Sequence, residues 1–253
     1  MRNPYVGITG FMSRAEVDAV LSEFPKTAAR ALMVGVLVSS KTLRGVPNKW
    51  PNRFPAVGNV AGIFPSHPQA LNLIHYSTDD KASLHDQLVE LVQLGGANLH
   101  GFQLNIAWPM PGAVRHFREA FPHLKLVLQV GWHAFEMVHH SPKLLAERVL
   151  YYGDSIDYVL LDPSGGLGKP LDVSKARGYL TALVTQMGFA QLAVAGGLGP
   201  DTLSLVEPLV KEFSELSIDA EGRLRDADDH LLLEACHVYV AKALGIFANR
   251  VTH

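Results

Sequence analysis

The chain has 253 residues, of which 48% are hydrophobic, and its 22 basic and 24 acidic residues leave a net charge of −2. This length fits one α/β barrel or two small domains, and a nearly balanced charge without a basic run gives no sign of a nucleic-acid-binding face. Because no apolar stretch reaches membrane-span length, the N-terminus lacks a signal core and Cys236 is the single cysteine, we expect a cytoplasmic protein without membrane contact.

Short apolar runs and helical patterns alternate along the chain. After the strand expected at 5–9, Ser13 and Glu16 have capping-box spacing at the start of a helix that Pro25 ends. Five prolines in 47–68 favour a long loop with at most one short helix. The other expected strands are 31–38, 70–76, 101–106, 125–130, the run from Tyr158 to Asp162, a run around Ala193, and 216–219. The other expected helices are 83–94, 111–121, 142–152, 173–187, 202–213 with a kink or restart at Pro208, and 229–246.

Eight strand–helix repeats in about 250 residues predict a single (β/α)8 barrel over residues 1–253. A doubly wound open sheet is the alternative. That fold would more often carry a G-x-G-x-x-G fingerprint after its first strand, and this sequence has none there.

The run from Tyr158 to Asp162 ends on a carboxylate and is followed by a glycine-rich loop. A buried parallel strand delivers its last residue to the functional edge of the sheet, so we expect Asp162 to be catalytic rather than a simple helix cap. Residues 191–200 show the same pattern of a short apolar run followed by glycines, but without a carboxylate at the end of the run. Since barrels often hold phosphate in the loops after strands seven and eight, Gly196 and Gly197 are the expected anion-binding turn.

Other polar residues stand at predicted strand ends, where they would converge in a barrel. They are Arg44, His75, Gln103, Asp219, Glu221 and Gly222. Arg44 is either a clamp for a carboxylate or phosphate or an ordinary solvated arginine. His133, His139 and His140 lack the spacing of a zinc helix and an acidic partner, so we expect no metal. Trp50, Trp108 and Trp132 either wall a pocket for a flat ligand or cover the core.

Residues 165–172 are Gly-Gly-Leu-Gly-Lys-Pro-Leu-Asp, and residues 195–200 are Ala-Gly-Gly-Leu-Gly-Pro. Both motifs resemble those of phosphoribosylanthranilate isomerases, a family of α/β-barrel enzymes of tryptophan synthesis. Residues 6–9 and 103–105 also resemble family motifs. The resemblance implies an Amadori rearrangement without a cofactor. It assigns the general acid to Asp162, the substrate contacts to Arg44, Gln103, Gly166 and Gly168, and the phosphate contacts to Gly196, Gly197 and Gly222.

The sequence departs from the family where the general base is expected. The family has a cysteine there, and this chain has Val6, which cannot accept a proton. His75, Asp219 and Glu221 are the possible replacements. The chain is then either an isomerase of a phosphorylated sugar derivative with an altered base, or a catalytically inert barrel that binds a phosphorylated metabolite or a partner protein. A barrel hydrolase or lyase on an unrelated substrate is a third possibility, because a fold does not fix a function.

Overall fold

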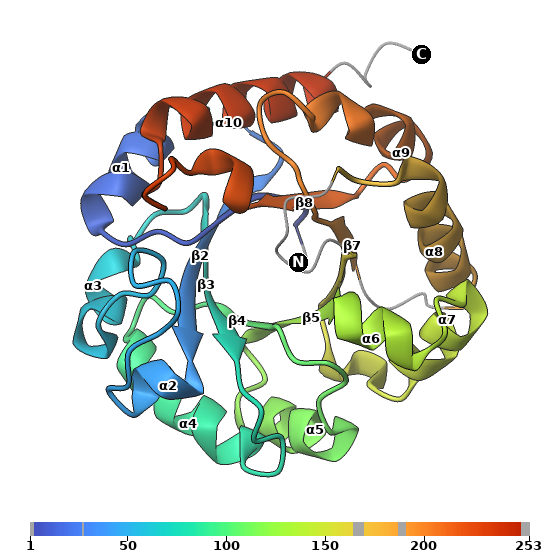
Figure 1. Cartoon of the computed structure of the whole chain (residues 1–253), viewed down its shortest axis with the longest axis horizontal. Helices are drawn as coiled ribbons and strands as arrows, with labels where there is room; N and C mark the ends of the chain where they lie inside the picture. The colour runs from blue at the N-terminus through green and yellow to red at the C-terminus, as the bar shows by residue number, and fades with distance from the viewer. Residues whose placement is uncertain (1–2, 27, 164–169, 187–190, 249–253) are drawn as a thin grey trace.

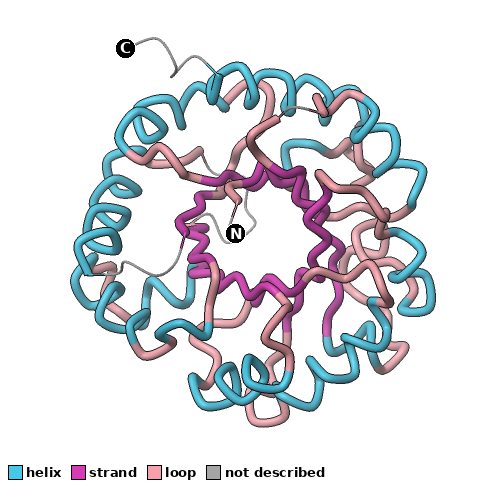
Figure 2. Tube along the Cα trace, turned by 180° about the vertical axis from the view of Figure 1, so that it is seen from behind, coloured by secondary structure: helices cyan, strands magenta, loops and turns pink. Residues whose placement is uncertain are grey.

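Eight parallel strands form a closed barrel in the order β1 to β8, with the helices outside it (Figures 1 and 2). The structure, a computed structural model, describes residues 3–26, 28–163, 170–186 and 191–248. The strands are β1 (Tyr5–Thr9), β2 (Ala31–Ser39), β3 (Ala70–Ser77), β4 (Gly101–Leu104), β5 (Lys125–Gly131), β6 (Tyr158–Asp162), β7 (Gln191–Val194) and β8 (Ser217–Ala220). The predicted (β/α)8 barrel is confirmed, and the open sheet is excluded.

The helices follow the strands, most of them as the sequence patterns predict, although the sequence did not predict the short helices at 40–43 and 132–137. They are α1 (Arg14–Ser22), α2 (Ser40–Leu43), α3 (Val60–Ile63), α4 (Leu84–Gly95), α5 (Pro111–Ala120), α6 (Trp132–Met137), α7 (Pro142–Leu150), α8 (Val173–Gln186), α9 (Glu207–Glu212) and α10 (Leu233–Ala248). Short 3-10 turns are η1 (Val57–Asn59), η2 (Gly153–Ser155), η3 (Leu203–Val206) and η4 (Gly222–Leu224).

Local sequence accounts for several helix ends. Ser13 and Glu16 form the expected capping box of α1, in which each side chain bonds the other residue's backbone N–H. The expected restart at Pro208 is confirmed, since η3 ends just before α9 and the proline lies in its first turn. The predicted start of the last helix at Asp229 is wrong. Asp229 has φ 71° in a turn that lies between the bridged residues Arg225 and Leu231, and α10 begins after that turn.

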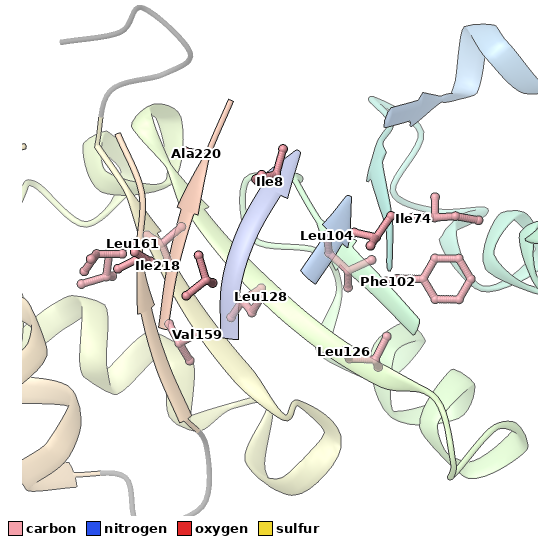
Figure 3. Close-up of a cluster of buried hydrophobic side chains, with 14 of the residues drawn as sticks. Ile8, Ile74, Phe102, Leu104, Leu126, Leu128, Val159, Leu161, Ile218 and Ala220 are labelled. Atoms are coloured by element: carbon pink, nitrogen blue, oxygen red, sulfur yellow. The ribbon is translucent and has the colours of Figure 1, made fainter. Parts of the chain in front are cut away.

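Side chains of the strands divide into an inner and an outer set. Tyr5, Met33, Leu73, Val127 and Leu160 form a buried cluster inside the barrel. The alternate residues pack between the barrel and the helices, where Figure 3 shows Ile8, Ile74, Phe102, Leu104, Leu126, Leu128, Val159, Leu161, Ile218 and Ala220. This alternation is the ordinary two-residue period of a strand, and it places polar residues on the inner face at the ends of several strands.

Val6 belongs to the outer set. It lies in the same buried cluster as Val17 and Val20 of α1, whereas a Cβ on Gly7 would meet the inward side chains of Met33 and Asp219. Val6 therefore faces the helices rather than the interior of the barrel, because its neighbours in β1 take the inner positions. No helix within the described ranges is long and apolar enough to span a bilayer.

Candidate functional site

A layer of polar side chains closes the barrel at the carboxyl ends of the strands, directly above the apolar inner cluster. Its members face inward from six different strands, β1, β3, β4, β5, β6 and β8. They are Thr9, His75, Gln103, Gln129, Asp162 and Asp219. In barrel enzymes this is the face on which chemistry takes place.

Asp219 of β8 is the most buried acid of the layer, with 4% of its surface exposed. The Thr9 hydroxyl lies 3.0 Å from both of its carboxylate oxygens, and the Gln103 amide nitrogen lies 3.2 Å from Oδ2. Burial raises the pKa of Asp219 to about 7, and the charges of Glu221 and Asp162 act in the same direction, while its hydrogen bonds oppose the change. Asp219 therefore exchanges a proton near neutral pH.

Two glutamines connect Asp219 with Asp162. Gln103 Nε2 lies 3.1 Å from Gln129 Oε1, and Gln129 Nε2 donates to Asp162 Oδ2 at 3.1 Å. The two acids are thus joined through a chain of amide groups across the inner face. One oxygen of Asp162 accepts the bond from Gln129, which orients the carboxyl group at the end of β6.

His75 is held as a neutral ring. Its Nδ1 lies 3.2 Å from Gln103 Nε2, a contact that fits the tautomer with the ring proton on Nε2. Burial lowers the pKa of His75 to about 4, although the charge of Asp162 opposes the change. Nε2 is buried and has no hydrogen-bond partner within the described residues, and it is available to donate to a ligand.

A cavity of about 50 Å³ opens above this layer. It is lined by Arg53, His75, Gln129, Asp162, Ala195, Gly196, Gly197, Leu198, Asp219, Ala220, Glu221, Gly222 and Arg223. Gly196 and Gly197 have φ of 106° and 61°, a conformation that favours glycine and that brings the backbone close to the cavity. The Thr202 hydroxyl donates to Gly197 O and fixes this turn.

Arg53 is a cavity residue that the sequence did not reveal. It lies in the proline-rich segment, where no hydrophobic period gives a side chain's direction. Its guanidinium pairs with Glu221 at 2.8 Å and with Asp229 at 2.6 Å. Burial would lower the pKa of Arg53, but the two carboxylates outweigh it and raise the pKa above its ordinary value.

The other predicted residues are placed as follows. Arg44 is the C-cap residue of α2, is exposed, and is not among the described cavity residues. Hydrogen bonds from Ser83 lower the pKa of Asp80, and the charge of Arg44 acts in the same direction. Gln103 is buried and does not itself line the cavity, but it contacts two residues that do, His75 and Asp219. Gly166 and Gly168 lie outside the described residues.

The three tryptophans differ in their surroundings. Trp108 is buried and donates to Ala134 O, so it covers the core. Trp50 and Trp132 are exposed, and Trp50 lies next to Arg53. Among the described side chains, no group of three or more histidines, cysteines and acids is arranged to hold a metal ion.

Comparison with family models and with curated proteins gives no match. Solved structures do match over nearly the full length. The phosphoribosylanthranilate isomerases of Thermus thermophilus and Thermotoga maritima have 14% and 18% identity, each with a TM-score of 0.66, and each alignment covers 96% of this chain and 99% of the other. A phosphoribosylanthranilate isomerase in complex with reduced 1-(o-carboxyphenylamino)-1-deoxyribulose 5-phosphate has 16% identity, a TM-score of 0.64 and the same coverage.

A chitinase catalytic domain from Pyrococcus furiosus is more distant, with 9% identity, a TM-score of 0.55, and coverage of 100% of this chain and 98% of that one. At these identities the likeness concerns the fold alone. The structural neighbours thus agree with the resemblance of the motifs: this chain has the (β/α)8 fold of the phosphoribosylanthranilate isomerases.

Proposed function

We propose that this chain is a cytoplasmic aldose–ketose isomerase of the Amadori type, acting on a phosphorylated sugar derivative. The observation that carries the proposal is the pair of acids, Asp162 and Asp219, which line one cavity beside a glycine turn. Aldose–ketose isomerisation needs an acid at one oxygen and a base at C2. A phosphate held by backbone N–H groups at Gly196 and Gly197 would fix the sugar between them.

The surroundings of the three possible bases favour Asp219. The low pKa of His75 leaves it a weak base, and its Nδ1 is occupied by Gln103. Glu221 is held in its ion pair with Arg53. Asp219, with its pKa raised to about 7, is a stronger base than an ordinary carboxylate.

In the proposed reaction the carboxyl group of Asp162 protonates the ring oxygen of the cyclic substrate. The ring C–O bond breaks as the lone pair of the C1 nitrogen forms a C=N bond, which gives a Schiff base; with ribose 5-phosphate, which has no nitrogen at C1, the C1 hydroxyl gives the aldehyde, and removal of the C2 proton gives an enediol instead. Asp219 then removes the C2 proton, and the electron pair moves to give an enolamine, which becomes the ketose. The Nε2–H of neutral His75 would donate a hydrogen bond to a substrate oxygen. A neutral imidazole can polarise that oxygen in this way without transferring its proton.

The experiment uses ribose 5-phosphate and phosphoribosylanthranilate as substrates in D2O, with proton NMR detecting loss of the C2 proton and formation of the ketose. We expect turnover of at least one of them. Asp219→Asn and Asp162→Asn should each lower the rate about 10²- to 10⁴-fold, since each removes one proton-transfer group.

The control is Glu212→Gln, which changes an exposed carboxylate paired with Arg177 on the outer helices. Its rate should equal that of the wild type. If neither sugar reacts but inorganic phosphate shifts the amide signals of Gly196 and Gly197, the chain is the inert binding barrel instead. Absence of both responses would refute binding as well as catalysis.

A further inference from the structure

Gln103 stands at the centre of the polar layer, where its amide nitrogen faces three acceptors. Its Nε2 lies 3.1 Å from Gln129 Oε1, 3.2 Å from Asp219 Oδ2 and 3.2 Å from His75 Nδ1. The side chain of Gln103 is 1% exposed, so bulk water does not supply a further donor. An amide nitrogen carries two hydrogens. One of the three acceptors is therefore left without a full hydrogen bond from Gln103.

The neighbours of Gln103 fix which end of its amide group faces them. Gln129 Nε2 donates to Asp162 Oδ2, which turns Gln129 Oε1 toward Gln103. Asp219 in its ionised form can only accept. Turning the Gln103 amide over would set its oxygen against these two oxygens. Gln103 Oε1 instead lies buried without a hydrogen-bond partner among the described residues, a loss that the bonds donated by Nε2 outweigh.

Two of the acceptors compete for one hydrogen. Gln129 Oε1 keeps the first hydrogen of Gln103, because an amide oxygen only accepts. Asp219 Oδ2 and His75 Nδ1 contest the second. When Asp219 is ionised, the bond to its carboxylate is charge-assisted and roughly twice as strong as a bond between neutral groups, so the carboxylate holds the hydrogen. When Asp219 is protonated, this advantage is lost, and the hydrogen can go to His75 Nδ1.

The layer also accommodates the proton of Asp219. The Thr9 hydroxyl lies 3.0 Å from both carboxylate oxygens. A hydroxyl can donate to a carboxylate or accept from a carboxyl O–H, so Thr9 serves both forms of Asp219. Burial raises the pKa of Asp219 to about 7, so both forms are populated near neutral pH.

The other ring nitrogen of His75 is the one left for a ligand. Nε2 is buried, has no hydrogen-bond partner within the described ranges, and belongs to a residue that lines the cavity. The contact at Nδ1 fits the tautomer with the proton on Nε2. Hydrogen bonds in series polarise one another, so a bond accepted at Nδ1 strengthens the Nε2–H donor. Gln103 can therefore change how strongly His75 donates to a ligand.

We propose that Gln103 is a positioning residue that couples Asp219 to His75: when Asp219 takes up a proton, Gln103 transfers its second hydrogen bond from Asp219 to His75 Nδ1. This inference rests on the proposed isomerase function. In that reaction the C2–H bond breaks, its proton goes to Asp219, and its electron pair moves toward C1, where the C1 oxygen of ribose 5-phosphate takes up negative charge. His75 Nε2–H becomes a stronger donor in the same step and keeps its proton.

Nitrogen-15 NMR of the free protein tests the coupling without any substrate. Burial lowers the pKa of His75 to about 4, so above pH 5.5 the ring is neutral and its Nδ1 signal reports the hydrogen bond. Between pH 5.5 and pH 9 we expect this signal to move in one step with a midpoint near pH 7. It should move upfield toward low pH, because accepting a hydrogen bond shields an unprotonated ring nitrogen.

Other ionisable groups of the described residues face Asp219 and His75. They are Tyr5, Tyr239, Arg53, Arg223, Asp162 and Glu221. The two tyrosines stay uncharged in this range, because burial and the charge of Asp219 raise their pKa values well above 10. The two arginines stay charged. Asp219→Asn separates Asp219 from the other two acids: the step should disappear in this variant, and a step that persists would overturn the inference.

Gln103→Met removes the amide with little change in volume. It should reduce the step at least threefold, because the charge of Asp219 then acts on the ring only through space. Gln87→Met is the matched control, since Gln87 is also a buried glutamine but accepts its hydrogen bond from Tyr76 between β3 and α4. Its step should equal that of the wild type. Should Gln103→Met fold poorly, Gln103→Asn keeps an amide one methylene shorter and should at least halve the step.

A wild-type signal that stays constant with pH, or a step of full size in the Gln103 variants, would overturn the inference. Both results leave the isomerase proposal standing, because the assay in D2O tests that proposal separately with substrate. A step of the expected size in a protein that turns over neither sugar would instead count against the proposed function, and the catalytic role of the coupling would fall with it.

Discussion

Replacing Asp219 by asparagine should change how the stability of the protein depends on pH. In the folded protein burial raises the pKa of Asp219 to about 7, compared with an ordinary value of 3.8. Between these two pH values the folded state keeps a proton that the unfolded chain has lost. The stability contributed by this group is therefore fully present below pH 3.8 and is lost as the pH rises through 7.

The size of the effect follows from the displacement of the pKa. Each pKa unit corresponds to 1.36 kcal/mol, so ionising Asp219 in the folded protein costs about 4 kcal/mol by pH 8. Asparagine does not ionise and escapes this cost. It retains one acceptor for Thr9 or Gln103, and the mismatch of its amide group with those donors costs about 1 to 3 kcal/mol at every pH.

Urea unfolding of the wild type and of Asp219→Asn at intervals from pH 4.5 to pH 8.5 measures the difference between them. We expect asparagine to be the less stable form at low pH and to gain about 1.4 kcal/mol per pH unit relative to the wild type until pH 7. Other titrating groups cancel in this difference. A difference that is constant with pH, or one that moves in the opposite direction, would refute the assignment of a raised pKa to Asp219.

Three further predictions concern other parts of the barrel. Val6→Cys should add no activity, because residue 6 faces the helices. The new thiol should react with a thiol reagent no faster than buried Cys236. Rapid labelling would instead place residue 6 at the mouth of the barrel. Gly197→Ala should destabilise the protein by about 1 to 2 kcal/mol because of its φ of 61°, and should weaken phosphate-induced amide shifts; an unchanged urea midpoint would contradict this. Arg118→Ala should cost about 3 to 5 kcal/mol at pH 7, because it leaves buried Asp157 without its closest cation. Burial opposes ionisation of Asp157, but the Leu126 N–H, Arg118 and Lys125 outweigh it and lower the pKa of Asp157. The stability that this pair contributes should therefore be lost as pH falls below about 4. If Arg118→Ala lost the same unfolding free energy at pH 3 as at pH 7, the result would argue against the pair.

Much of the fold could be predicted because it depends on local patterns. The run from Tyr158 to Asp162 is a strand since it is apolar, short and followed by glycines, and its last residue lines the mouth. The capping box at Ser13 and the prolines at 142 and 208 mark helix starts by their own chemistry. The start of α10 was predicted too early because Asp229 lies in a turn instead of the helix. This turn is held by a long-range ion pair between Arg53 and Asp229, which the local sequence does not reveal.

The candidate site was only partly accessible to the same reasoning. His75, Asp219 and Glu221 could each be placed at a strand end, but their ranking as bases depends on neighbours that are distant in sequence. Gln103 occupies one nitrogen of His75, and Thr9 and Gln103 bind Asp219. Arg53 gave no sequence signal, because its direction is set by two acids about 170 residues away.

The sequence by itself determined the alternation of strands and helices, the closed barrel that this alternation favours, and the end of the barrel to which Asp162 and Gly197 belong. Only the tertiary structure decided which residues of β1 face inward. All five residues of this strand are buried, so hydrophobicity does not distinguish its two faces. A shift of one residue exchanges the inner and outer sets, and contacts with Met33, Asp219 and α1 place Gly7 inside and Val6 outside.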